Sequence, residues 1–138
     1  MTGSGIDAAE MLRRLAGTLK TEVAPQVSAE YAWTQAFMAS VIIERLAKQV
    51  ELADEHAAME VSDLTRLCSE LEGILASSPP AVTRALAAFS AGPSTSGLGP
   101  LIDELYAWGL DEVAAGEALA AIRPVLRRDI DRRMEVAR

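Results

Sequence analysis

The residues most suited to metal chemistry are a short run of two acids and the single histidine, Asp54-Glu55-His56. Helical di-iron sites need Glu-x-x-His motifs on two helices with further glutamates opposite, and this sequence has no such motif. Three consecutive residues of a helix also point in different directions. We therefore interpret the run as a solvated turn at a helix end and predict no metal site.

Cys68 is the only cysteine, so no intramolecular disulfide can form, and a nucleophilic role would need a base close by. His56 lies twelve residues upstream, more than three turns away along a continuous helix. Cys68 also falls on the apolar side of a predicted helix, where cysteine behaves as a small hydrophobic residue. We interpret it as a core residue.

The loop over residues 91–99 has the glycine spacing of a phosphate-binding loop, with Gly92 and Gly97 separated by four residues. Leu98 and Gly99 stand where such a loop needs lysine and a hydroxyl residue. We predict a flexible linker there. The sequence thus predicts no catalytic residue and no cofactor, and it favours a non-catalytic role.

Charge and hydropathy narrow the class of protein. The 138 residues carry a formal net charge of −7, although residues 123–138 hold six arginines against three acids. A predominantly acidic chain repels polyanions, so we expect no nucleic-acid partner. The first residues lack the pattern of a signal peptide, and the apolar run 36–43 is far shorter than the ~20 residues of a membrane span. We expect a cytoplasmic protein, and eleven arginines against two lysines indicate a bacterial source.

Alanine, leucine, glutamate and arginine dominate the sequence, and these are strong helix formers. We predict an all-α fold: one domain over residues 1–138, flexible at 1–5, forming a bundle of five to six helices. The first helix begins at Asp7 as N-cap and ends at Pro25, and Pro124 is expected to kink or split the last helix. The other predicted helices cover residues 28–52, 57–75, 81–89 and 100–108, and the last starts near Asp111.

The helix predicted over 28–52 lies at the centre of this bundle. Its middle, Ala36–Ile43, is apolar nearly all round, so neighbouring helices or a partner chain must enclose it. Two hypotheses follow: an interaction protein that forms a homodimer or binds a partner subunit, or a small-molecule-binding bundle or enzyme with a cavity between helices. The polar Thr34, Gln35 and Ser40 could line such a cavity, although hydrogen bonds to the helix backbone or across helices explain them equally well. The candidate interface or pocket residues are Tyr31, Trp33, Gln35, Phe37, Met38, Val41 and Ile42.

The stretch Leu12–Leu52 also resembles a known family. An amphipathic helix, the turn Glu22-Val23-Ala24-Pro25-Gln26-Val27, and a long helix ending in Ala47-Lys48-Gln49-Val50-Glu51-Leu52 are similar to a small bacterial helical domain of unknown function. That domain accompanies aminoglycoside-phosphotransferase-like kinases. Its helix usually carries an internal Arg and Asn, which Phe37–Val41 lacks. The resemblance implies an accessory subunit that binds such a kinase, and it carries over no catalytic residue.

Overall fold

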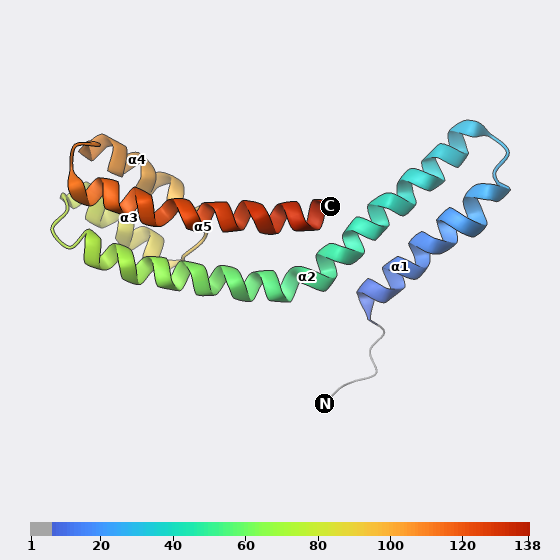
Figure 1. Cartoon of the computed structure of the whole chain (residues 1–138), viewed down its shortest axis with the longest axis horizontal. Coiled ribbons are helices and arrows are strands. Elements are labelled where there is room, and N and C mark those ends of the chain that lie inside the picture. Colours follow the sequence, from blue (N-terminus) through green and yellow to red (C-terminus); the bar gives the residue numbers. More distant parts are fainter. Residues whose placement is uncertain (1–6) are drawn as a thin grey trace, which may run out of the picture. The chain divides into compact units, whose positions relative to one another are not determined.

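The computed structural model describes residues 7–138, and within them every regular element is a helix (Figure 1). The prediction of an all-α bundle is confirmed for this part of the chain, while the predicted flexible segment 1–5 lies outside it. The five α-helices are α1 (Ala8–Thr18), α2 (Glu30–Ile74), α3 (Pro80–Ala91), α4 (Leu98–Trp108) and α5 (Val113–Ala137).

Helix α2 differs most from the sequence-based expectation. It runs for 45 residues and unites the helices predicted over 28–52 and 57–75. The acidic and histidine run, Asp54 to His56, is therefore part of the helix and not a turn. The physical reason is the absence of a breaker, since no proline or glycine occurs between Ala29 and Gly73. A change in amphipathic pattern alone does not end a helix.

The start of α1 follows the prediction, but its end does not. Asp7 is the N-cap, and its side-chain Oδ1 accepts a hydrogen bond from the backbone N–H of Ala9 at 3.1 Å. A π-helical turn (Leu19–Val23) and a 3-10 turn (Ala24–Gln26) then continue the helical path. Pro25 lies within the 3-10 turn, where proline is tolerated because the first N–H groups have no intrahelical partner. The chain becomes extended only at Val27.

The chain forms two compact units. The boundaries between them fall inside α2, after His56, and inside α5, after Arg133. One unit comprises residues 57–133, namely the second part of α2, α3, α4 and most of α5. Its core is rich in large aliphatic side chains, and the fully buried ones include Leu67, Leu71, Leu98, Leu101, Leu105 and Ile122. The other unit comprises residues 1–56 and 134–138. That the whole chain acts as one domain stays a prediction.

Two further expectations concern the second half of the chain. Helix α5 is continuous through Pro124, so the predicted split does not occur. Pro124 is exposed, whereas its neighbours Ile122 and Val125 are buried in the core, and this packing holds the helix together across the proline. Gly109 ends α4 with a φ of 127°, a backbone conformation that favours glycine.

Hydropathy along the helices bears on membrane insertion. Among residues 7–138, no helix combines the length and the apolar character needed to cross a membrane.

Candidate interaction surface

Helix α1 and the first part of α2 form an antiparallel helical hairpin (Figure 1). Two contacts fix its register. The Arg13 guanidinium pairs with the Glu51 carboxylate, and the Lys20 ammonium lies over the Phe37 ring, 5.7 Å from its centroid. The path from Arg13 in α1 to Lys20 in the π-helical turn therefore runs alongside α2 in the reverse direction, from Glu51 to Phe37.

The buried seam of this hairpin is made of small side chains. In the described part of this unit the fully buried residues are Ala9, Ala16, Ala24, Ser40 and Ala47. The Ser40 hydroxyl donates a 2.6 Å hydrogen bond to the backbone carbonyl of Phe37, which satisfies it inside its own helix. Small residues let two helices approach closely but bury little apolar area, so this seam supplies only weak hydrophobic stabilisation.

The large apolar side chains of the hairpin lie on its outside. Of the sixteen exposed large hydrophobic residues among residues 7–138, nine lie in the hairpin, between Met11 and Val50. Seven of them recur at helical spacing and define what we call the hairpin face: Met11, Leu15, Tyr31, Met38, Ile42, Leu46 and Val50.

On the helical wheel, both rows of the hairpin face point largely away from the buried seam: Met11 lies about 200° from Ala9, and Ile42 about 200° from Ser40. On α1, half-buried Leu12 and Leu19 lie on the helical wheel between the buried alanines and the row Met11 and Leu15. On α2, half-buried Ile43 links the buried seam to the exposed row in the same way.

One edge of the hairpin is polar and aromatic. It carries the Arg13–Glu51 pair and the cation–π contact of Lys20 with Phe37. Trp33 stacks on Phe37 with the ring centroids 5.6 Å apart and the planes 12° from parallel. This edge of the hairpin therefore combines charged groups with an aromatic stack.

The candidate residues from the sequence divide between the hairpin face and the polar and aromatic edge. Tyr31, Met38 and Ile42 lie on the hairpin face, and Tyr31 is 77% exposed. Phe37 and Trp33 stack on the other edge. Gln35 is exposed and Val41 is half-buried.

Four members of the hairpin face were missed: Met11, Leu15, Leu46 and Val50. Their signal was present, since Leu46 and Val50 continue the four-residue spacing of Met38 and Ile42. The missing fact was that alanines, and not leucines, form the seam of the hairpin. A sequence pattern with several apolar sides does not say which side faces the neighbouring helix.

Two of the three polar residues proposed to line a cavity, Thr34 and Ser40, make local hydrogen bonds. The Thr34 hydroxyl donates to the backbone carbonyl of Glu30 at 3.0 Å, as the Ser40 hydroxyl does to Phe37. These are the helix-backbone hydrogen bonds that the sequence left as an alternative to a cavity.

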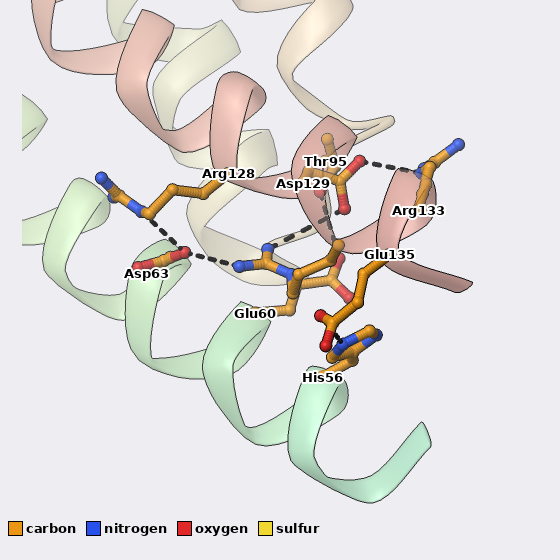
Figure 2. A network of polar contacts seen from close by, with 9 residues as sticks. His56, Glu60, Asp63, Thr95, Arg128, Asp129, Arg133 and Glu135 are labelled. Atoms are coloured by element: carbon orange, nitrogen blue, oxygen red, sulfur yellow. Dashed lines mark hydrogen bonds and ion pairs between the residues drawn. The ribbon is translucent and has the colours of Figure 1, made fainter. Parts of the chain in front are cut away.

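A cluster of charged residues lies in the other unit, between α2 and α5 (Figure 2). The Asp63 carboxylate accepts hydrogen bonds from Arg128 Nε at 3.1 Å and from Arg132 Nη1 at 3.0 Å. Burial by itself raises the pKa of Asp63, but the hydrogen bonds and positive charges of the two arginines outweigh it and lower the pKa. Asp129 adds a 3.0 Å pair with Arg133 and lies 3.9 Å from Arg132.

These ion pairs give the arginine-rich C-terminal segment a structural role. Arg132 is buried, and removing it from water requires the partners that Asp63 and Asp129 supply. Arg128 is partly exposed and closes the other side of Asp63. The cluster therefore ties the two long helices together within this unit.

The single histidine and the single cysteine also have structural surroundings. His56 Nε2 lies 3.0 Å from Glu135 Oε2 (Figure 2). Cys68 is half-buried and packs against the core cluster of its unit. Among the described residues, no group of three or more histidine, cysteine, aspartate or glutamate side chains is placed to hold a metal ion.

Fold and surface thus define an all-α protein whose helical hairpin carries an apolar outer face. No protein-family model, curated protein or solved structure matches the chain.

Proposed function

We propose that this chain is a non-catalytic helical interaction protein that binds a protein partner through the hairpin face. The observation that carries the proposal is that the hairpin buries its small residues and exposes large apolar ones. Its seam is alanine and serine, while Met11, Leu15, Met38, Ile42 and Leu46 are about half exposed. An apolar surface of this kind is typical of an interface.

The energetics of short helices support the same proposal. Isolated helices are marginal in water, and most helical stability in proteins comes from packing of an apolar side. The hairpin packs its small residues internally and leaves its larger apolar residues in water. Covering the hairpin face with a partner would supply the stabilisation that the seam lacks.

The resemblance over Leu12–Leu52 suggests one class of partner, an aminoglycoside-phosphotransferase-like kinase to which the chain would be an accessory subunit. A second copy of the chain is the other candidate, which would make the hairpin a homo-oligomerising module. Either partner would use the same surface.

The alternative of a small-molecule cavity lined by Tyr31, Trp33, Phe37 and Met38 has less support. Tyr31 and Met38 are exposed, and Trp33 stacks on Phe37 at the polar edge. A ligand cavity normally encloses most of the ligand surface, which side chains standing in water do not do.

Sedimentation of the purified full-length chain, alone and mixed with a kinase encoded beside it, tests the proposal. We expect a complex with one of the two partners, and we expect Ile42→Glu to weaken it, because a charge would be buried in the interface. A chain that stays monomeric alone and binds no such kinase would contradict the proposed function.

A further inference from the structure

We infer that the unit formed by residues 57–133 binds a small organic cation, an ammonium ion carried on an apolar chain, in a groove between α2 and the loop that follows α3. The groove has a volume of about 360 Å³. Its lining residues are Ala57, Glu60, Val61, Leu64, Thr65 and Pro93. All of them lie outside the hairpin, so the inference goes beyond the proposed function and is tested independently of it.

One wall of the groove is a single side of α2. Ala57, Glu60, Val61 and Leu64 are three or four residues apart from one another in turn, which places them on the same side of the helix. Leu64 is only 3% exposed and belongs to the core cluster, whereas Val61 is 65% exposed. The groove therefore has an apolar floor and an open side through which a ligand can enter.

The other wall comes from the loop between α3 and α4. Pro93 lines the groove, and the Thr95 hydroxyl donates a 3.1 Å hydrogen bond to Glu60 Oε1 (Figure 2). A turn holds this loop, since the Gly97 N–H donates to the Ser94 carbonyl at 3.1 Å. The bond from Thr95 therefore ties the loop to α2 and orients the Glu60 carboxylate at the groove.

Glu60 gives the groove its charge. Among residues 7–138, no basic side chain forms an ion pair with this half-buried carboxylate, whereas Asp63, one turn further along α2, is matched by two arginines. A carboxylate beside apolar side chains loses part of its hydration, and a cation compensates for that loss. The net charge of −7 adds a general attraction for cations.

An ammonium ion on an aliphatic chain matches both parts of the groove. Its N–H groups can donate charge-assisted hydrogen bonds to Glu60, while its carbon chain covers the apolar floor. A neutral chain lacks the charge that Glu60 selects, and an anion is repelled by it. Ligand sites usually have volumes of about 300–1,000 Å³, so a groove of about 360 Å³ suits a small ligand.

Titration of the isotope-labelled full-length chain with hexylammonium, followed by backbone amide chemical shifts, tests the inference. We expect saturable shifts at Ala57, Val61 and Thr65, with a dissociation constant in the millimolar range because the ligand has few atoms. Hexanol, the neutral analogue, should bind about tenfold more weakly, since it cannot form the charge-assisted hydrogen bond.

Glu60→Gln separates the charge from the shape of the site. The variant keeps the size of the side chain and an oxygen that can accept from Thr95. It should bind hexylammonium about tenfold more weakly than the wild type and bind hexanol unchanged. Glu70→Gln, at an exposed carboxylate of α2 in the same unit, is the matched control and should bind as the wild type does.

A second variant fills the apolar part of the groove. Ala57→Phe replaces an exposed residue of the lining, so the fold should tolerate it, and the shifts at Thr65 should disappear. Ala120→Phe, at an exposed position of α5, is its control and should leave them unchanged.

Several results would overturn the inference. They are equal binding of hexylammonium and hexanol, equal binding by the wild type and Glu60→Gln, shifts that spread over the acidic surface without saturating, and no shifts at all. None of these results concerns the hairpin face, so the proposed function would stand in each case.

Discussion

Asp63 and Arg132 form a buried ion pair that joins α2 to α5, with 3.0 Å between Asp63 Oδ2 and Arg132 Nη1. The two residues are 69 positions apart in the sequence. Both side chains are nearly excluded from water, so each depends on the other for its hydrogen bonds. The charge of the C-terminal segment is thus used inside the protein as well as on its surface.

Asp63→Asn should destabilise the folded chain. The substitution keeps the size of the side chain but removes the charge that balances Arg128 and Arg132. Removing one partner of a buried ion pair lowers the free energy of unfolding by about 3 kcal/mol. Asp129, which lies 3.9 Å from Arg132, should offset part of this loss. Urea unfolding measures the loss. Asp103→Asn, at an exposed carboxylate of α4, is the control and should change stability by less than about 0.5 kcal/mol.

The same pair predicts a pH dependence. Its arginines lower the pKa of Asp63 in the folded chain below the ordinary value of 3.8, so the unfolded chain binds the proton more readily. The stabilisation is therefore complete above pH 3.8 and is lost as the pH falls through the lowered pKa. The stability difference between wild type and Asp63→Asn should narrow in that acidic window. A difference that stays constant down to the lowest pH at which both chains fold would contradict this account.

Leu101→Ala tests the core of the unit formed by residues 57–133. Leu101 is fully buried in the leucine-rich cluster, and truncating such a side chain loses its transfer free energy and leaves a cavity. We expect a loss of about 2–5 kcal/mol in urea unfolding. Leu110→Ala is the matched control because Leu110 is exposed between α4 and α5. Equal effects at the two positions would show that the leucine cluster is not the core.

Ala47→Leu tests the close approach of the two helices in the hairpin. Ala47 is fully buried in the seam, where a larger side chain must push α1 away from α2. We expect a loss of about 1–3 kcal/mol, the usual cost of overpacking. Circular dichroism during urea unfolding reports it. The control Ala120→Leu lies at an exposed position of α5 and should have little effect. A neutral Ala47→Leu would mean that the seam is looser than its burial indicates.

Much of the secondary structure was predictable from the sequence. The cap at Asp7 and the short helix ending before Gly109 follow from local signals that act within a few residues. The boundary near Leu52 was wrong because it was inferred from a change in polarity, whereas α2 continues as long as no residue breaks it. The split at Pro124 was wrong because burial of neighbouring residues outweighs the missing hydrogen bond.

The site was predictable only in part. Tyr31, Met38 and Ile42 were identified because the helix around them is apolar on every side, which requires some cover. Met11 and Leu15 were not singled out, because large apolar residues of an amphipathic helix usually face the core. Ala9 and Ala16 occupy that place instead.

The sequence by itself determined that the described chain is helical and that one helix carries more apolar surface than an ordinary bundle helix needs. These properties depend on propensity and spacing, which act locally. Tertiary structure decided which apolar side is buried, because that choice depends on how closely two helices approach. It also decided that Asp63 meets Arg132, since contacts between residues so far apart in the sequence leave no local pattern. Small residues occupy the buried seam of the hairpin, and its large apolar residues are therefore left exposed.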